Sequence, residues 1–424
     1  MGNSNGESAV AANQEYVRII RLFRERFKNE SIETLPQEDL EKFELYKAAK
    51  AKLESELKEA ENNLSRSNKL HQTYIKAREA LKSWFPNYNY NLETLNRIDT
   101  LNNNLGPHVR EIQEVINWKE SDRLINYLNK KSKLTLNHTL NINFNDREVV
   151  GDNPYDINDT IYGNNQVFAQ SNFFDHGTRV SSFITSVIND SKNIKILPIS
   201  KSPSGDYYDK DLALAIRYAI NKGAKVINMS FLKSFSLNNE WVIDAFKYAE
   251  EKNVLLVAAA GNSSKNIDYE KKFPSDNNSN GDEVIENFIT VGASGHTIDE
   301  NLRAYFSCYG KKDVDLFAPG IHIKTAVPNH NNYGDSLYLD QDAGTSLSAA
   351  LTSGAAALIL SHYPNLTATE VKNILMESGI TYTFPVKINA EDNNKLPFNE
   401  LSKSGKILNI YNALIMAERL SNSK

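Results

Sequence analysis

The chain has 424 residues, of which 40% are hydrophobic and 24% are charged, and its formal net charge is −5. This composition is ordinary for a soluble globular protein of two or three domains. The small negative charge gives no reason to expect nucleic acid or an anionic membrane surface as a partner. The single cysteine, Cys308, excludes an internal disulfide, and the first 16 residues lack the apolar core of a signal peptide.

The first 148 residues are predicted to form a helical arm or insertion. They contain three of the 19 glycines and repeat apolar residues at three-to-four spacing among charges of both signs. Residues 38–85 fit either one long helix or a helical pair before Pro86, and shorter helices are expected at 92–101 and 107–131. A coiled-coil interaction role stays open, although a structural insertion is the more common explanation for such a segment.

Residues 149–424 alternate short β-branched runs with helical ones. Strands are expected at 193–200, 224–230, 253–260, 287–294, 314–320 and 323–328, with helices at 209–223 and 239–253. Buried strands that alternate with helices indicate an α/β domain whose central sheet is parallel and covered by helices on both faces. In such three-layer domains, active groups lie at the carboxyl ends of strands and at helix N-termini.

The stretch DAGTSLSAALTSGAAALIL, residues 342–360, has no charge after its first residue. Its hydroxyls and glycines dilute the apolar run too much for a membrane span, so it is predicted to be a core helix. The helix opens with Gly344, Thr345 and Ser346. Thr345 or Ser346 could simply cap it, as hydroxyl residues often do.

Two further residues give Ser346 a chemical context. His176 is expected at the start of a helix, and Asn262 follows the buried strand that ends in AAAGN. A base, an amide donor and a hydroxyl at the ends of strands and helices suit acyl transfer. His176 would remove the Ser346 proton, and the Asn262 amide with the Ser346 backbone N–H would stabilise the oxyanion.

The motifs HGTRV, AAAGN and GTSLSAA, in this order, resemble the His, Asn and Ser motifs of the subtilases, the subtilisin-like serine peptidases. VINMS, FSCYG, FAPG and YPNLTATEVKNILMESG match further family segments, so the resemblance covers about residues 149–424. It implies endopeptide hydrolysis of polypeptide substrates through an acyl-enzyme on Ser346, with no cofactor needed for the chemistry. It also implies substrate binding by Ser230, Phe231 and Gly261, and an extracytoplasmic or secreted location.

The largest departure from the family pattern is that the motif of the catalytic Asp is missing. That residue precedes the His motif in a strand ending Asp-Ser/Thr-Gly, and this chain has no such tripeptide. Asp99 lies in a helical pattern and is discounted, which leaves Asp152 as the best internal substitute. The simplest expectation is that the chain begins after its own catalytic Asp. An upstream segment or a second chain would then supply the strand. The alternative is a catalytically impaired fragment or a non-catalytic interaction protein.

Smaller departures concern the surroundings of the motifs. Arg179 and Ser182 stand where the family often has His and Gly, and Ala350 stands where Pro is usual. Leu232 replaces a common Gly, which predicts a narrower substrate cleft. Subtilases frequently bind structural calcium, and residues 274–287 and 151–159 are rich in oxygen ligands. Neither run has a recognised ligand spacing, so no metal ligand is assigned.

Overall fold

The computed structural model describes residues 2–5, 7–87, 91–98, 104–117, 121–167, 175–188, 193–201, 204–278, 281–328, 337–388 and 394–424. Its contacts divide the chain into two compact units, one of Val10–Glu148 and the other of Met1–Ala9 with Val149–Lys424. Residues 2–9 therefore belong with the second unit, although the sequence grouped them with the helical part. The backbone N–H of Gly163 donates to the carbonyl of Gly2 at 2.8 Å, which ties the two pieces together.

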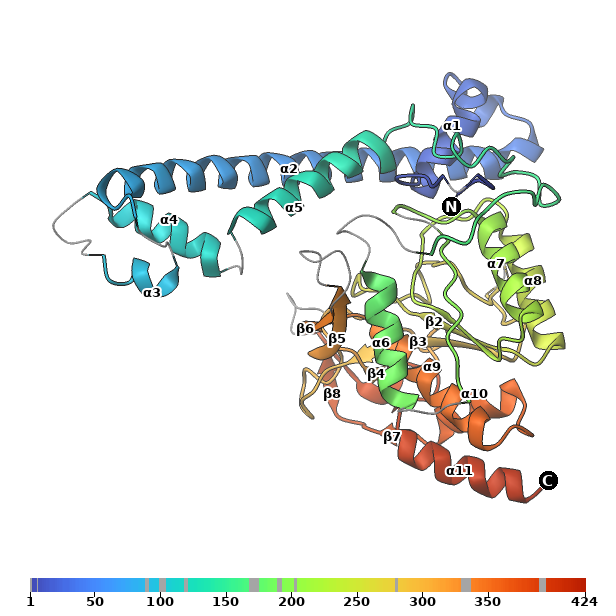
Figure 1. Ribbon diagram of the computed structural model, residues 1–424. Helices are drawn as coiled ribbons and strands as arrows, with labels where there is room; N and C mark the ends of the chain where they lie inside the picture. Colours follow the sequence, from blue (N-terminus) through green and yellow to red (C-terminus); the bar gives the residue numbers. More distant parts are fainter. Residues whose placement is uncertain are drawn as a thin grey trace. The chain divides into compact units, whose positions relative to one another are not determined.

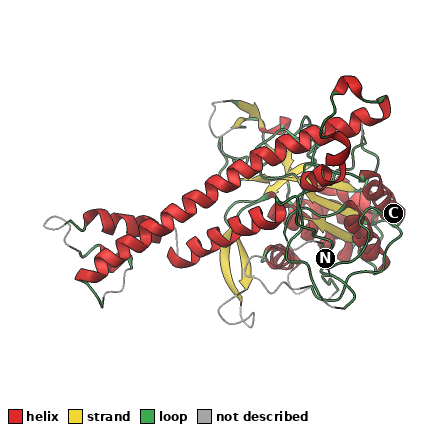
Figure 2. Cartoon of the chain, turned by 90° about the horizontal axis from the view of Figure 1, so that it is seen from above, coloured by secondary structure: helices red, strands yellow, loops and turns green. Residues whose placement is uncertain are grey.

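The unit of Val10–Glu148 is built on one long helix. After α1 (Glu15–Phe27) and two short 3₁₀ turns, η1 (Ile32–Thr34) and η2 (Gln37–Asp39), α2 runs without a break through 45 residues (Leu40–Trp84). The stretch before Pro86 is thus a single helix. Both views show α4 (Gly106–Asn117) and α5 (Ser121–Leu134) lying along α2 (Figures 1 and 2). The remaining elements are α3 (Leu92–Leu95) and the π-helical turn η3 (Thr135–Thr139).

Two clusters hold this unit together. A hydrophobic cluster joins α2 to the α3–α4 segment through buried side chains that include Leu81, Leu95 and Ile112. At the other end, the buried Arg18 guanidinium on α1 contacts Glu15 at 2.6 Å and Asp146 at 3.3 Å. Because buried charges are tolerated only when paired, Asp146 fixes the returning chain against α1.

The second unit contains the predicted sheet. In the described part of the chain it has six strands in the order β1-β2-β3-β4-β10-β7. The first five are parallel, and only the edge strand β7 is antiparallel to its neighbour β10. The strands are β1 (Val226–Met229), β2 (Leu255–Ala259), β3 (Phe288–Ser294), β4 (Leu316–Pro319), β7 (Ile380–Thr381) and β10 (Lys406–Ile407). Two antiparallel hairpins stand apart from the sheet: β5 (Ile323–Pro328) with β6 (Leu337–Asp342), and β8 (Pro385–Lys387) with β9 (Lys395–Pro397).

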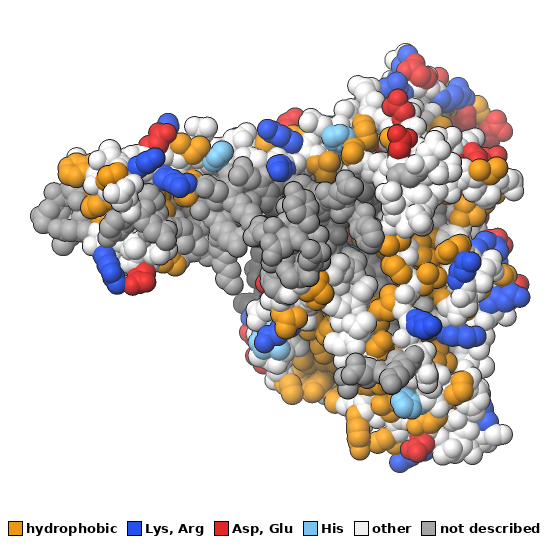
Figure 3. Space-filling model, in the orientation of Figure 1, with side chains coloured by type: hydrophobic (Ala, Val, Ile, Leu, Met, Phe, Trp, Pro, Cys, Tyr) orange, Lys and Arg blue, Asp and Glu red, His pale blue; other side chains and the backbone are white. Residues whose placement is uncertain are grey.

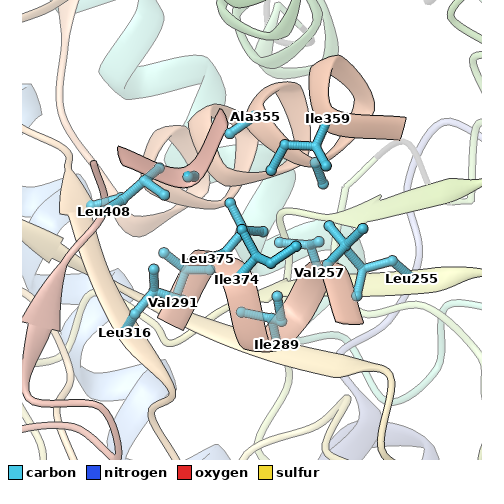
Figure 4. Packing of buried hydrophobic residues seen from close by; sticks show 14 of the residues in the cluster. Leu255, Val257, Ile289, Val291, Leu316, Ala355, Ile359, Ile374, Leu375 and Leu408 are labelled. Carbon is cyan, nitrogen blue, oxygen red and sulfur yellow. The ribbon is translucent and has the colours of Figure 1, made fainter. Parts of the chain in front are cut away.

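Helices cover both faces of the sheet, which confirms the three-layer α/β prediction. Successive side chains of a strand point to opposite faces. Leu256 and Ala258 of β2 therefore pack with α7 (Asp209–Asn221) and α8 (Asn239–Glu251). Leu255 and Val257 pack with α9 (Thr345–His362), α10 (Ala368–Glu377) and α11 (Ile410–Asn422) (Figure 4). A further helix, α6 (His176–Ile188), packs against α9.

One expected strand is missing, and the prediction for residues 193–200 was wrong. This segment forms no strand, and Ile196, Leu197 and Ile199 are 38%, 46% and 38% exposed. Figure 3 shows hydrophobic side chains on the face where Figure 1 draws this segment, between α6 and α7. A run of apolar residues becomes a strand only when a neighbouring strand takes its hydrogen bonds. Within the described residues, β1 is the sheet's edge and pairs only with β2.

The predicted core helix is confirmed as α9, and its central residues Ala355, Ala356 and Ile359 are fully buried. None of the described helices is both long enough and apolar enough to cross a bilayer.

Candidate active site

Ser346 is the second residue of α9 and lies where the helix meets the carboxyl end of β1. Its neighbours Thr345 and Leu347 are buried, whereas Ser346 itself is partly open to solvent. The Ser346 hydroxyl donates to the carbonyl of Ser230 at 3.2 Å, and the Ser230 hydroxyl donates to the carbonyl of Ser346 at 2.7 Å. The two hydrogen bonds join the first turn of α9 to the residue that follows β1, so the nucleophile candidate stands on a rigid support.

Thr345 holds Asn262 in a defined orientation. The Asn262 Oδ1 accepts hydrogen bonds from the backbone N–H and from the hydroxyl of Thr345, both at 3.0 Å. The Thr345 Oγ1 in turn accepts from the backbone N–H of Gly261 at 3.1 Å. Because Oδ1 is occupied, the Asn262 Nδ2 is left to point away from Thr345, and the side chain is exposed. The helix N-terminus therefore presents an oriented amide donor next to the Ser346 backbone N–H, as an oxyanion site requires.

His176 is the first residue of α6, as predicted, and it is exposed. No hydrogen bond joins it to Ser346, and within the described residues neither of its ring nitrogens has a hydrogen-bond partner. The structure thus brings Ser346, Asn262 and Ser230 together through hydrogen bonds, and among the described residues it leaves the His176 ring without a group that orients it. Catalytic hydrogen bonds are often long in free enzymes, so this geometry does not remove His176 as the base.

Arg179 pairs with three carboxylates, and two of them, Asp175 and Asp342, act electrostatically on His176. It contacts Asp175 at 2.9 Å, Asp340 at 3.5 Å and Asp342 at 3.7 Å, and so ties α6 to the β5–β6 hairpin. The surrounding protein removes part of the water from one side of the His176 ring, and this desolvation lowers the pKa of His176 below its ordinary value; the charges of Lys201 and Arg179 add to the effect. Asp342 and Asp175 oppose it and raise the pKa. A lowered pKa keeps the imidazole neutral, and therefore able to accept a proton, at a more acidic pH.

Replacing Arg179 with Gln removes one positive charge that lowers the pKa of His176 and releases Asp175 and Asp342 from it. We expect the pKa of His176 in Arg179→Gln to rise, so that the ring becomes charged at a higher pH than in the parent. An NMR titration of the His176 ring signal, assigned with a His176→Gln variant, measures this shift. Arg217→Gln is the control, because Arg217 pairs with Asp244 between α7 and α8. An unchanged or lowered pKa in Arg179→Gln contradicts the electrostatic account.

Asp152, the proposed internal substitute for the catalytic Asp, is engaged elsewhere. Its Oδ2 accepts a hydrogen bond from Lys210 Nζ at 2.7 Å, and both side chains are buried. Lys210 is on α7, on the face of the sheet opposite to α9 and α6. A buried pair of this kind is costly to break, so Asp152 is not available to orient His176. Asp99 lies outside the described residues.

The three residues predicted to bind substrate lie just beyond the ends of β1 and β2. Ser230 supports Ser346, and Gly261 adjoins Asn262 with a φ of 109°, a conformation that favours glycine. The Phe231 ring packs against Tyr207 at 5.1 Å between centroids and under the Lys201 ammonium at 4.8 Å. The ends of β1 and β2 thus form the floor beside the Ser346 hydroxyl.

Both calcium candidates have internal partners. Within the described residues, no cluster of three or more Asp, Glu, His or Cys side chains is arranged to hold a metal ion. In the 151–159 run, Asp152 pairs with Lys210, and Asp159 and Asp156 accept hydrogen bonds from the backbone of their own loop. In the 274–287 run, Glu283 pairs with Lys403 and lies 4.0 Å from Lys372.

A pair of buried carboxyl groups lies beside these lysines. Lys372 and Lys403 approach Asp315 Oδ1 at 3.7 and 3.4 Å, whereas Asp276 Oδ2 has no hydrogen-bond partner among the described residues. Burial, together with the charge of Asp315, raises the pKa of Asp276 to about 7. The folded protein therefore holds a proton on Asp276 that the unfolded chain releases above about pH 4.

This proton makes stability depend on pH. The folded pKa of Asp276 exceeds the unfolded value, so the free energy of unfolding falls as pH rises from about 4 to about 7 and then levels off. We expect Asp276→Asn to remove the penalty, with a gain of a few kcal/mol at pH 8 and a smaller gain at pH 5. Urea unfolding at both pH values measures it. The exposed Asp282→Asn, in the same loop, is the control, and an equal gain at both pH values would contradict the assignment.

The chain is similar to known proteases. The Subtilase family model matches residues 96–403. The cell wall-associated protease of Bacillus subtilis (strain 168) is 33% identical over 236 residues, covering 53% of this chain and 24% of that protein. Subtilisin DY of Bacillus licheniformis is 32% identical over 223 residues, covering 48% of this chain and 70% of that protein. Among solved structures, a lanthipeptide protease has 23% identity and a TM-score of 0.43, over 57% of this chain and 75% of that one.

The match spans only 24% of the first of these relatives and 70% of the second, so it concerns one part of each protein. The residues matched by the family model, 96–403, contain the His176, Asn262 and Ser346 motifs and strands β1 to β4, and they make up well over half of the chain. The chain therefore belongs to the Subtilase family.

Proposed function

We propose that this chain carries the catalytic machinery of a serine endopeptidase, with Ser346 as nucleophile, His176 as general base and Asn262 as oxyanion donor. The observation that carries the proposal is the hydrogen bonding of Thr345, which orients the Asn262 amide beside the Ser346 backbone N–H. A preorganised pair of donors next to a hydroxyl has a direct use in acyl transfer. A simple helix cap would not need the amide of a second segment.

In the proposed reaction the Ser346 hydroxyl first leaves the Ser230 carbonyl and turns to His176. Its oxygen attacks the peptide carbonyl carbon while its proton passes to His176, and the carbonyl electron pair moves to the oxygen as an oxyanion. Asn262 Nδ2 and the Ser346 N–H stabilise this charge, helped by the N-terminal dipole of α9. The tetrahedral intermediate collapses, and His176 returns the proton to the leaving amine. Water then repeats the sequence on the acyl-enzyme and regenerates the Ser346 hydroxyl.

We propose that the substrate is a polypeptide that lies across the ends of β1 and β2. Ser230, Phe231 and Gly261 would flank the acyl group there, because Ser230 bonds to Ser346, Phe231 follows Ser230, and Gly261 bonds to Thr345 and precedes Asn262. None of these steps requires a cofactor. An extracytoplasmic location is proposed as well, on the strength of the relative named as cell wall-associated.

We further propose that an additional strand, from an upstream segment or a second chain, carries the carboxylate that orients His176. Two observations support it. Val226 and Ile227 of the edge strand β1 are only half-buried, whereas every residue of β2 is buried. The segment 193–201 carries exposed apolar side chains and reaches the end of β1, where Lys201 lies over the Phe231 ring. A strand between them would bury both apolar surfaces.

The direction of such a strand suits the chemistry. Parallel neighbours in this sheet end at the same edge, so a strand parallel to β1 would finish beside Ser230 and near the α6 N-terminus. Lys201, at the end of the 193–201 segment, already acts electrostatically on His176. An Asp at the carboxyl end of the added strand would therefore face the His176 ring.

Mass spectrometry of an unfolded protein substrate tests the proposed function. We expect new peptide termini with the chain as it stands, faster cleavage when a strand peptide is added, and much slower cleavage with Ser346→Ala in both cases. If the parent chain produces no termini with or without the strand peptide, the endopeptidase proposal fails and the alternative of a non-catalytic interaction protein is favoured.

A further inference from the structure

Leu232 fills the space beside the proposed acyl site. A Cβ atom on Gly261 would lie 2.8 Å from Leu232 Cδ2 and 3.2 Å from Cys308 Sγ. Contacts this short mean that the open side of Gly261 is already occupied by these two side chains. The floor between the ends of β1 and β2 is therefore covered by a leucine rather than left as a slot.

Leu232 is held in place from both sides along the chain. The next residue, Lys233, exchanges backbone hydrogen bonds with Phe273 at 2.7 and 2.9 Å, and its buried ammonium contacts Asp209 at 2.8 Å. The preceding residue, Phe231, is packed against Tyr207. Since both neighbours are anchored in the protein, the backbone of Leu232 cannot shift easily, and its side chain is held beside Gly261 and Cys308.

Leu232 is close in sequence and in space to the residues that hold the proposed reacting groups. Ser230, two residues earlier, holds the Ser346 hydroxyl at 3.2 Å, and Asn262 directly follows Gly261. A substrate carbonyl group whose carbon is next to Ser346 Oγ and whose oxygen accepts from Asn262 Nδ2 would lie between the segment that follows β1 and the segment that follows β2. The side chain on the acyl side of that carbonyl then meets the floor that Leu232 and Gly261 form.

We infer that Leu232 is a specificity-determining residue that restricts the substrate residue on the acyl side of the cleaved bond to a small side chain, such as Gly, Ala or Ser. This inference rests on the proposed function, because it uses the acyl position that Ser346 and Asn262 define. An aromatic or long aliphatic side chain would have to displace Leu232, and closely packed side chains that cannot move penalise added volume steeply.

The test compares two peptides that differ only in Ala or Phe at this position. The parent chain should cleave the Ala peptide with at least about tenfold higher kcat/KM, and Leu232→Gly should reduce or reverse the ratio. Leu339→Ala, which changes an exposed leucine of β6, should leave the ratio unchanged. Cleavage that depends on Ser346 but shows no preference, or a preference unaffected by Leu232→Gly, overturns the inference and leaves the proposed function intact.

The affinities of the two peptides can also be compared in a variant that does not cleave them. In the Ser346→Ala background, calorimetry should show the Phe peptide binding at least about tenfold more weakly than the Ala peptide. Adding Leu232→Gly should remove most of that difference. If neither peptide is cleaved by the parent chain, the proposed function fails, while these binding data still decide whether Leu232 limits the site. Equal binding of the two peptides to the Ser346→Ala variant overturns the inference.

Discussion

Ser346→Ala should lower kcat for peptide hydrolysis by about 10⁶-fold when the histidine-orienting strand is present, which is the loss known from removal of the nucleophile of subtilisin, a member of the same family. In the chain without that strand the loss should be only about 10²-fold, because nucleophile, base and orienting carboxylate act as a unit and their effects do not add. Assays of a chromogenic peptide with and without the strand peptide measure both values.

The control for this prediction is another hydroxyl on the same helix. Ser361 lies near the far end of α9, where its hydroxyl donates to the carbonyl of Leu358 at 2.8 Å. We expect Ser361→Ala to keep the parent rate. A Ser346→Ala variant that hydrolyses the peptide as fast as the parent would show that another residue, or a contaminant, performs the reaction.

A strand peptide should raise the hydrolysis rate of the parent chain by about 10⁴-fold at saturation, the inverse of the loss caused by removing the Asp from subtilisin. The peptide would be an extended, Val- and Ile-rich segment of about eight residues ending in Asp-Ser-Gly, long enough for an ordinary strand. Its backbone would pair with the edge strand β1, and its carboxylate would orient His176 and stabilise the imidazolium that forms.

Two matched peptides separate the roles of backbone and carboxylate. Asn in place of Asp should bind equally well but leave the rate near that of the chain alone. A central Pro, which removes a ladder hydrogen bond, should prevent binding. If the Asn peptide activates as much as the Asp peptide, the added strand acts by stabilising the sheet and supplies no carboxylate.

The fold was predictable wherever local pattern and tertiary contacts agree. Buried runs such as 253–260 became strands, and the uncharged 343–361 run became α9, because each is apolar enough to require a core position. The segment 193–200 has the same pattern but forms no strand in the described structure. Its local sequence is suitable, but a strand also needs a hydrogen-bonding neighbour, and that depends on residues far away in the chain or outside it.

The sequence motifs predicted which residues belong to the candidate site, but not the contacts that orient them. His176, Asn262 and Ser346 could be named from the sequence, whereas the role of Thr345 in orienting Asn262 could not, because it links positions 83 residues apart. The hydroxyl of Thr345, between Gly344 and Ser346, was the only sign in the sequence of this role, and it was interpreted as a helix cap. The buried carboxyl groups of Asp276 and Asp315 were missed for the same reason, since neither the polar loop around Asp276 nor the apolar run that follows Asp315 shows that the two lie close together.

The most direct test of the account is the rate at which a fluorophosphonate probe labels the chain, since such a probe reacts with an activated serine. Peptide mapping would locate the label, and the rate would be measured with no strand peptide, with the Asp peptide and with the Asn peptide. We predict labelling at Ser346 alone, slow in the isolated chain, much faster with the Asp peptide, and absent from Ser346→Ala. Labelling of Ser346 at one rate under all three conditions would contradict the proposed strand, and no labelling under any of them would contradict a catalytic Ser346.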